Sequence, residues 1–209
     1  MARAGLTEDR VVIEAERIAD EVGLSQLTLA ALAGNLGVRQ PSLYKHIDGM
    51  GALQRSIAVR AKRELAEVLG RAAVGRARGD AIRALADAYR TWAVEHPGRY
   101  AATTRAPIPG DVDDKAASDA VVTVVLDILS GYHLTGDSAI DATRTMRSAL
   151  HGFVSLETND GFGLPVSIDR SYDFLVDSLV AALAAADESA NEPANEARPS
   201  RTVSGGPGR

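Results

Sequence analysis

The stretch LGVRQPSLYKHIDGM, residues 36–50, places hydrogen-bonding side chains between two apolar segments. Six of its residues carry donors, namely Arg39, Gln40, Ser42, Tyr44, Lys45 and His46. Side chains of these types bind phosphate oxygens and the base edges exposed in the major groove of DNA. An ordinary surface helix would mix in acids, and here the stretch contains only Asp48. The residue types therefore predict a DNA-reading element rather than a polar surface loop.

Three positions around these donors have the residue types that a helix-turn-helix needs. Ala33 is small enough for close helix contact, Gly37 can adopt the left-handed conformation of the turn, and Leu43 is apolar and placed to enter the core. Two helices joined by a glycine-centred turn also form ordinary αα-hairpins, so the spacing alone does not decide. The donor-rich segment after the glycine favours the helix-turn-helix.

The elements that would position this segment are helical. Alternating β-branched runs hardly occur, so we expect an all-α fold with an N-terminal three-helix helix-turn-helix domain followed by a C-terminal helical bundle. Thr7, Thr28 and Asp48 are expected N-caps, and Gly23 and Gly37 are expected helix ends. Helices are predicted from Thr7 to Gly23, from Thr28 to Gly37, over about 41–47, from Asp48 through at least Val68, and over 80–96, 100–105, 116–131, 138–159 and 168–186.

The second short helix is expected to begin at a proline. Gln40 precedes Pro41, which should push Gln40 out of the helical region, whereas Pro41 suits a first helical turn. The domain boundaries expected from these patterns are 1–50 for the helix-turn-helix, 51–186 for the helical body and 187–209 for a tail. The tail is rich in proline and glycine with one bulky apolar residue, Val203, so we expect it to be disordered.

Charge is unevenly distributed along the chain. The net charge is −5, yet residues 24–63 contain six cations and one acid. Such a basic segment on an acidic body is the expected footprint of a surface that faces a polyanion. Four of these cations, Arg55, Arg60, Lys62 and Arg63, are expected on the surface of the long helix, away from its apolar face.

The stretch LTLAALAGNLGVRQPSLYKHIDGMGAL, residues 27–53, resembles the N-terminal DNA-binding domain of TetR-type transcriptional regulators. The resemblance covers roughly residues 6–53 and implies that Arg39, Gln40 and Ser42 face base edges and that Pro41 makes an apolar contact such as with a thymine methyl. It implies phosphate contacts for Thr28, Tyr44 and His46, and either role for Lys45. Family members often carry a lysine at the start of the next helix. Here Asp48-Gly49-Met50-Gly51 supplies none, so more would depend on backbone amides, Lys45 and Arg55.

The same resemblance implies a C-terminal domain that binds a small effector and forms a homodimer. The large side chains expected around a cavity are Tyr89, Trp92, His96, Tyr100, Leu126, Met146 and Phe153. Apolar stripes of the last two helices could pair with a second subunit or form core, and the residues expected there are Leu150, Tyr172, Leu175, Val176, Leu179 and Leu183. The segment RSALHGFVSLE resembles the tryptophan-histidine-glycine branch of these domains, with Leu150 in place of the tryptophan.

Two other classes of function compete with a regulator. Catalysis is disfavoured because the sequence has no cysteine, no HExxH, no GxSxG and no Walker-type loop, and because the four histidines are far apart in the sequence. A helical adaptor that binds only proteins would explain the apolar stripes but not the donors. We therefore expect a non-enzymatic repressor that binds double-stranded operator DNA as a homodimer, with no cofactor or metal. No apolar run suits a membrane span or signal peptide, so the expected location is the cytoplasm.

Overall fold

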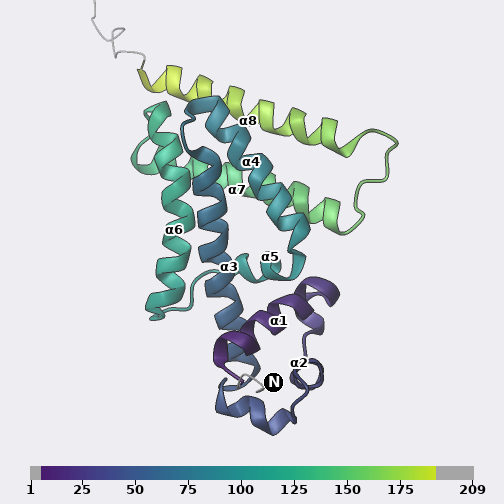
Figure 1. The fold of residues 1–209 in the computed structure, drawn as a ribbon. Coiled ribbons are helices and arrows are strands. Elements are labelled where there is room, and N and C mark those ends of the chain that lie inside the picture. Colours follow the sequence, from purple (N-terminus) through teal and green to yellow (C-terminus); the bar gives the residue numbers. More distant parts are fainter. Residues whose placement is uncertain (1–5, 192–209) are drawn as a thin grey trace, which may run out of the picture.

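The computed structural model describes residues 6–191, and every regular element in this range is helical. The N-terminal part, here called the head, contains α1 (Glu8–Val22), the 3₁₀ turn η1 (Leu24–Gln26), α2 (Leu29–Leu36) and the 3₁₀ turn η2 (Gln40–Lys45). The long α3 (Gly49–Ala73) starts in the head and runs into the larger helical part, here called the body (Figure 1).

The first two helices begin and end where local chemistry predicts. The Thr7 hydroxyl accepts a hydrogen bond from the Arg10 N–H at 3.3 Å, and the Thr28 hydroxyl accepts one from the Ala31 N–H at 3.1 Å. Gly37 is left-handed with φ 67°, and its N–H bonds the Gly34 carbonyl at 3.1 Å. Both expected N-caps and both expected glycine ends are confirmed.

The expected helix over 41–47 forms instead as the six-residue 3₁₀ turn η2. Arg39, and not Gln40, is the extended residue that precedes it. The segment is short because the turn at Gly37 and the start of α3 lie close together in sequence. Pro41 has no N–H to donate, and the first bond runs from the Ser42 N–H to the Arg39 carbonyl at 2.8 Å, which closes a 3₁₀ turn. Asp48 takes the N-cap position of α3, but its side chain makes no capping hydrogen bond.

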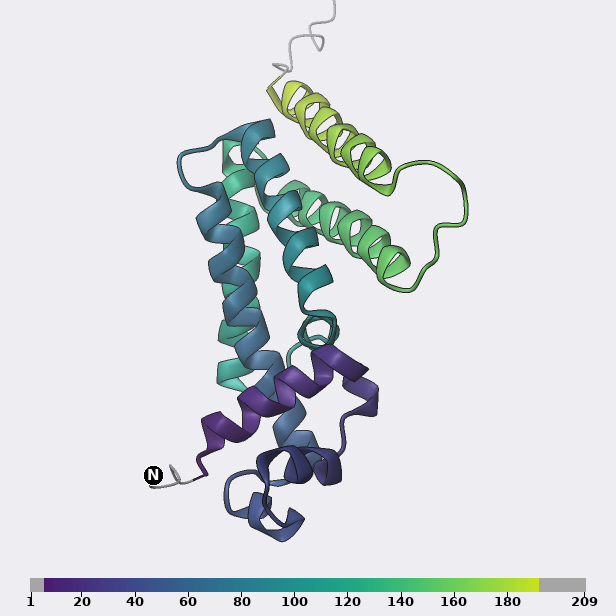
Figure 2. The same ribbon diagram turned by 45° about the vertical axis from the view of Figure 1, so that its right-hand side comes forward.

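The body consists of α4 (Arg78–Glu95), α5 (Pro97–Thr103), α6 (Val112–Leu129), α7 (Gly136–Thr158) and α8 (Ile168–Asn191), with the 3₁₀ turn η3 (Ser130–Tyr132) after α6. Each corresponds to a helix expected from the sequence, with bounds that differ by a few residues. α3, α4 and α6 run side by side, whereas α7 and α8 extend from the end of this group that lies away from the head (Figures 1 and 2).

Two apolar cores meet along α3. The first joins α1, α2 and η2 to the start of α3 through Leu53, Ile57 and Ala58, and it also takes in Ala102 of α5. The second begins at Ala61 and extends through the body. A single helix therefore serves both parts, and the change of core falls near residues 58–61, further along α3 than the domain boundary expected after residue 50.

The last helix runs further than the sequence analysis predicted. α8 continues to Asn191, and Asp187, expected in the disordered tail, is buried. Its carboxylate accepts a hydrogen bond from Arg78 at 2.7 Å and lies 2.9 Å from Nδ1 of His133. These two partners come from segments far away in sequence, so the local composition did not reveal them. The rest of the predicted tail, residues 192–209, lies outside the described residues.

No described helix is by itself long and apolar enough to cross a membrane. The segments Val112–Tyr132 and Gly136–Thr158 meet a length and composition test only when taken together, and they are bent by 117° relative to each other.

Candidate DNA-binding surface and ligand cavity

The donors of the turn η2 point away from the head. Arg39, Gln40, Pro41 and Lys45 are exposed, and the side chain of Tyr44 is 54% exposed. Ser42 and His46 are half-buried, and Thr28 is exposed beside its capped helix. The turn lies at the tip of the head, as far from α8 as any part of the described chain (Figure 1). No body helix covers this set of side chains.

The side chain of Leu43 anchors the turn η2 in the core of the head. Its side chain is fully buried in the core of the head, next to Ala33, which is 3% exposed. The carbonyl of Leu43 accepts hydrogen bonds from the N–H groups of His46 at 2.8 Å and Ile47 at 3.0 Å. The close helix contact and the apolar plug predicted for a helix-turn-helix are therefore present. Burial of Leu43 fixes which side chains of the turn face outward.

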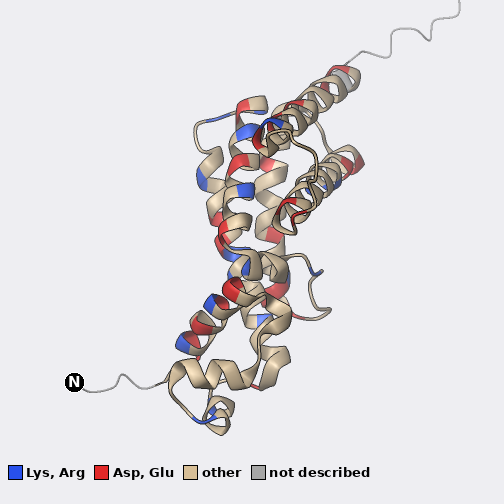
Figure 3. Cartoon of the chain, turned by 90° about the vertical axis from the view of Figure 1, so that its right-hand side faces the viewer, with Lys and Arg blue, Asp and Glu red and all other residues tan. Residues whose placement is uncertain are grey.

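The basic segment is mostly neutralised inside the molecule. Arg55 binds Asp111 at 2.5 Å, Arg60 binds Glu16 at 3.0 Å, and Arg63 lies 3.6 Å from Asp113. These cations were expected to form part of a polyanion-facing surface, but acids of α1, α6 and the residue before α6 pair with them. The body and α1 carry acids beside these cations (Figure 3).

Within the described residues, Arg39 and Lys45 are the two cations of the basic segment that form no ion pair. Both lie on or beside η2, at the tip of the head (Figure 3). The positive charge available to a polyanion is thus concentrated at the turn η2 rather than spread along α3.

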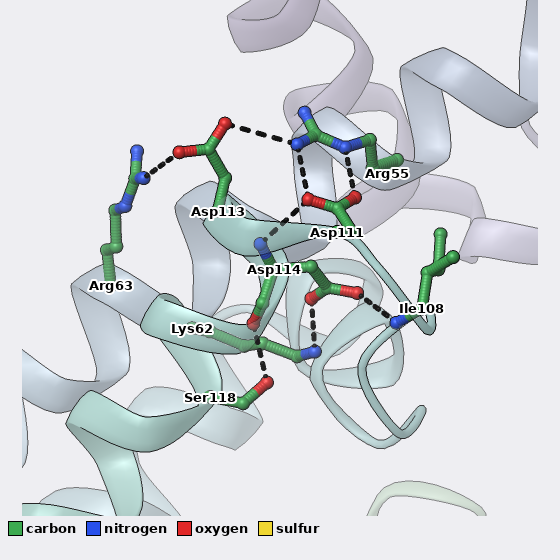
Figure 4. A network of polar contacts seen from close by, with 8 residues as sticks. All are labelled: Arg55, Lys62, Arg63, Ile108, Asp111, Asp113, Asp114 and Ser118. Atoms are coloured by element: carbon green, nitrogen blue, oxygen red, sulfur yellow. Dashed lines mark hydrogen bonds and ion pairs between the residues drawn. The ribbon is translucent and has the colours of Figure 1, made fainter.

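A buried ion pair joins α3 to α6. Nζ of Lys62 donates to Oδ1 of Asp114 at 2.6 Å, and the two residues are 3% and 0% exposed. The other oxygen of Asp114 accepts the N–H of Ile108 at 3.0 Å (Figure 4). Burial raises the pKa of Asp114, but the hydrogen bonds from Lys62 and from the Ile108 N–H more than offset it, so the net pKa is lowered.

Four further side chains extend this contact to the surface. Arg55 bridges Asp111 and Asp113, and Asp113 also faces Arg63 (Figure 4). The Arg55 guanidinium holds the pKa of Asp111 well below its usual range. Asp111 also caps α6 by accepting the N–H of Asp114 at 3.1 Å. The start of α6 is therefore held against α3 by one buried pair and one surface network.

The head and the body also meet at α5. The Arg99 side chain donates to Asp20 of α1 at 2.7 Å and to Glu64 of α3 at 2.7 Å. Next to it, Gly98 packs so closely on α1 that a Cβ added at this position would lie 2.1 Å from the backbone of Ala19. Only glycine fits this contact. α5 therefore lies between the head and the helices of the body.

The body contains a cavity of about 360 Å³ between α3, α4, α6, α7 and the segment 103–107. Of the side chains expected around a cavity, Tyr89 and Met146 line it. Its apolar wall also includes Leu65, Leu69, Leu85, Val121, Val125 and Leu150. The volume falls within the range of about 300–1,000 Å³ usual for small-molecule sites.

The remaining expected cavity residues lie elsewhere. Trp92 is buried in the core, and Phe153 packs against Phe162 and Tyr172 with ring centroids 4.8 and 5.0 Å apart. Leu126 is 37% exposed on α6. None of the three lines the cavity, because helical spacing shows which residues share a face but not which face meets a void.

Neither Tyr100 nor His96 lines the cavity, although Tyr100 contacts two residues that do. The Tyr100 hydroxyl lies 2.8 Å from that of Tyr89 and 2.5 Å from Nδ1 of His151. His151 lines both this cavity and a second, more open hollow of about 550 Å³, which Tyr100 also lines. His96 faces Arg99 through Nδ1 at 2.5 Å and lines neither space.

The stripe expected at a dimer interface is core within one chain. Leu150 lines the cavity, and five residues predicted to pair between subunits, Leu150, Tyr172, Val176, Leu179 and Leu183, are at most 8% exposed. The Tyr172 hydroxyl donates to the Ala86 carbonyl at 2.6 Å, which ties α8 to α4. Only Leu175 of the predicted set is half-buried. The broad apolar stripe is the side of α8 that faces its own chain, and the five buried residues form core, which is the second of the two outcomes that the sequence pattern left open.

Sequence reasoning missed Lys62 and Asp114. Lys62 was expected on the polar side of α3, but it lies four residues after buried Ala58 and three before buried Leu65, in the apolar stripe itself. A cation at a core position is a signal that a buried partner is needed. The spacing alone could have shown this for Lys62, although it could not have identified Asp114, which is distant in the sequence.

Comparisons with known proteins agree with this architecture. Residues 82–179 match the family model "Tetracyclin repressor-like, C-terminal domain". The chain is 42% identical over 155 residues to the uncharacterized HTH-type transcriptional regulator Rv0681 of Mycobacterium tuberculosis, covering 74% of this chain and 71% of the relative. It is 37% identical to the uncharacterized HTH-type transcriptional regulator YobS of Bacillus subtilis, covering 83% of this chain and 91% of that protein.

Solved structures share the fold. The putative regulatory protein SCO4313 superposes with a TM-score of 0.68 at 26% identity, covering 83% of this chain and 95% of that one. TetR from Acinetobacter baumannii AYE superposes with a TM-score of 0.64 at 21% identity, covering 88% of this chain and 99% of that one. With the head, the turn and the body described above, these matches show that the chain belongs to the TetR family of helix-turn-helix transcriptional regulators.

Proposed function

We propose that this protein is a repressor that binds a palindromic operator as a homodimer and releases it when a small molecule enters the cavity of the body. The observation that carries the proposal is the exposed, donor-rich turn η2, anchored by buried Leu43 and bearing the unpaired cations Arg39 and Lys45. A compact head with such a turn fits the major groove, which is wide enough for a helical element.

The proposed roles within the turn follow from residue chemistry. Gln40 suits a bidentate contact with adenine, Arg39 one with guanine, and Pro41 an apolar contact with a thymine methyl. Ser42 is half-buried and suits a short contact to a base edge. Thr28, Tyr44 and His46 suit phosphate oxygens, and Lys45 suits either partner. Arg55, which the sequence analysis included as a possible phosphate contact, is left out because Asp111 and Asp113 hold it.

The proposed dimer uses the outer faces of α7 and α8. On α8, Phe174 is 76% exposed, and the residues Ser178, Ala181, Ala182 and Ala185 continue the same exposed side at helical spacing. On α7, Gly152 has open space where a Cβ would stand. Small residues allow two helices to approach closely, and isologous pairing of these faces gives the two-fold symmetry that a palindromic site requires.

The release step is supported by the position of the cavity. The cavity is lined by residues of α3, which begins in the head, and by the segment 103–107, which starts at the last residue of α5. A ligand that fits the cavity best in one arrangement of these elements shifts the population toward that arrangement. Two of the solved structures with this fold are complexes with small molecules, a single-residue variant of TetR from Acinetobacter baumannii AYE with minocycline and ActR of Streptomyces coelicolor with (S)-DNPA. The cytoplasm, where bacterial DNA lies, is the proposed location.

Selection of DNA from a random-sequence pool with the full-length protein tests this proposal. The expected product is a pseudo-palindrome whose half-sites are separated by about one helical turn or a multiple of it, bound by two subunits. A reporter gene placed behind the selected site should then be expressed less when the protein is present. A pool without any enriched sequence would contradict DNA reading, and a higher reporter signal would contradict repression.

A further inference from the structure

The cavity of about 360 Å³ in the body has a mostly apolar wall. The charged residues in its lining are three cations, Lys62, Arg105 and Arg147, and one acid, Asp119. Four charged residues lie in or beside it as two matched pairs. Lys62 binds Asp114 at 2.6 Å, and Lys115 binds Asp119 through a short salt bridge. Neither pair leaves a net charge for a ligand to compensate.

Two arginines of the lining have no carboxylate partner among the described residues. Arg105 forms no ion pair, and the hydrogen bond of Arg147 goes to the carbonyl of Thr104 at 3.2 Å. Both side chains belong to exposed residues at the edge of the cavity, on the segment 103–107 and on α7 respectively. The cavity thus combines an apolar interior with two uncompensated positive charges at its edge.

Both arginines act electrostatically on side chains in or next to the cavity lining. Arg105 contributes to lowering the pKa of Asp114, whose carboxylate holds Lys62 of the cavity wall. The charge of Arg147 acts on Tyr89 and Tyr100, although burial is the larger effect and raises both pKa values. Arg147 lines the cavity together with Tyr89 and His151.

The same end of the cavity can donate a hydrogen bond to an acceptor. Tyr89, Tyr100 and His151 form a chain with contacts of 2.8 and 2.5 Å. Each hydroxyl carries one proton, so the chain has two possible directions. If His151 donates through Nδ1 to Tyr100, and Tyr100 donates to Tyr89, then the proton of the Tyr89 hydroxyl is left for a ligand oxygen. An anionic oxygen favours this direction.

We propose that the cavity binds an amphipathic monoanion, with an apolar chain among the leucines and valines and a carboxylate held by Arg105 and Arg147. The inference rests on the proposed function, because it names the chemical class of the effector. The apolar wall supplies affinity for the chain, and the two guanidiniums supply the preference for an anion over a neutral or cationic head of the same size.

Direct binding to the full-length protein without DNA tests the inference. Three probes share one chain and differ in head-group charge, namely decanoate, 1-decanol and decylamine. By isothermal titration near neutral pH, decanoate should bind about tenfold tighter than decanol, as expected for charge-assisted hydrogen bonds, and decylamine should bind more weakly than decanol. Equal affinity for decanoate and decanol would overturn the inference.

Variants of the arginines assign the preference to this site. Arg147→Gln and Arg105→Gln should each lower the affinity for decanoate about fivefold to tenfold and leave that for decanol unchanged. Arg144→Gln is the matched control, because Arg144 is exposed one turn before Arg147, does not line the cavity and lies 4.0 Å from Asp141. Loss of decanoate binding in the control as well would contradict the assignment. Urea unfolding of each variant checks that the fold is retained.

The two proposals fail separately. A preference for decanoate supports the inference even in a protein that enriches no DNA sequence, and that second result counts against the proposed function alone. A protein that reads a palindrome but binds all three probes equally overturns only the inference. Release of the selected DNA by decanoate, and not by decanol at the same concentration, would support both.

Discussion

The carboxylate of Asp114 is fully buried and holds two segments at once, the Lys62 ammonium of α3 and the Ile108 N–H of the loop before α6. A buried pair of this kind adds little net stability over an apolar pair, but removal of one partner leaves a buried charge without compensation. Replacement of either Asp114 or Lys62 is therefore expected to lower the stability of the protein much more than the pair itself raises it.

The first prediction concerns this pair. Asp114→Asn removes the charge but keeps the shape, and we expect it to lower the free energy of unfolding by about 3–5 kcal/mol, measured by urea unfolding. Asp119→Asn is the control, because it breaks the exposed salt bridge to Lys115 on the same helix and should cost at most about 0.5 kcal/mol. Equal effects of the two changes would show that the buried pair has no special role.

Residue types alone predicted part of this picture. The donors of η2, the plug Leu43 and the caps Thr7 and Thr28 were all identified correctly, because each depends on a few neighbouring residues. The pairing of Arg55 with Asp111 was not predicted, since the two are 56 positions apart. Whether a cation faces solvent or a distant acid is a property of tertiary packing, and this is why the basic footprint was overestimated.

At the scale of elements, α5 is one contact between the body and the head, in addition to the shared helix α3. Its Gly98 lies against the backbone of α1, and its Arg99 binds both Asp20 of α1 and Glu64 of α3. The sequence predicted a short helix here but not its position. The helix was expected only from residue 100, after a break at Pro97-Gly98, but it begins at Pro97, a residue that suits a first helical turn, whereas the close approach to Ala19 depends on how two distant helices pack.

The second prediction tests this close approach. Gly98→Ala should lower the free energy of unfolding by about 1–3 kcal/mol or more, because the added methyl group meets backbone that cannot move out of the way as a side chain can. Gly34→Ala is the control. Gly34 lies within α2 with nothing within 4 Å of its Cβ position, so this change should stabilise the protein by about 0.5–1 kcal/mol. Thermal or urea unfolding of both variants decides; no loss of stability in Gly98→Ala would contradict the tight contact.

At this scale several residues expected around the cavity or at the dimer interface lie in the core instead, and for one reason. Apolar periodicity indicates which side of a helix is buried but not what covers it. Tyr172, Val176 and Leu183 were expected between two subunits, yet they pack inside one. Trp92 and Phe153 were expected around a void, yet they fill the core.

For the whole molecule, acid stability depends on carboxylates that are charged in the fold. The pKa values of Asp111 and Asp187 are lowered mainly by hydrogen bonds from Arg55 and Arg78 respectively, and that of Asp114 is lowered on balance by Lys62 and Ile108. The unfolded chain therefore binds more protons in acid than the folded chain. Their stabilising contribution is fully present above the unfolded pKa and is lost as the pH falls through the folded values.

The third prediction follows from this sign. The urea midpoint should be nearly constant between about pH 5 and pH 7 and should fall steadily below about pH 4. Glu16 acts in the opposite direction, because burial raises its pKa, so its contribution is lost as the pH rises through that value. The pKa of Glu14 is lowered too, mainly by its hydrogen bond from Arg17, so four carboxylates with a lowered pKa stand against one with a raised pKa, which gives net acid lability. A midpoint that rises on acidification would contradict the ion-pair assignments.

The fourth prediction concerns the salt dependence of DNA binding by the proposed dimer. Arg39 and Lys45 are the cations of the basic segment that form no ion pair within the described residues, so a dimer brings about four positive charges to the DNA and log K against log salt should have a slope of about −4. The full basic segment would give a slope of about −10. Lys45→Gln should reduce the slope by about 2, one for each head, whereas Arg63→Gln should leave it unchanged because Asp113 faces Arg63. A slope near the larger value would show that the ion pairs open on DNA.

The central claim is that the exposed side of η2 reads DNA, and the most direct test is the affinity of the double variant Gln40→Ala/Tyr44→Ala for the selected operator, measured by fluorescence anisotropy. The fold should persist because both side chains are exposed, and the affinity should fall by at least about a hundredfold, since a lost bidentate base contact costs about 1–3 kcal/mol in each half-site. The control Val94→Ala/Glu95→Ala changes two exposed residues of α4 and should bind like the unmodified protein. Equal operator affinity of the η2 variant and the control would contradict the account.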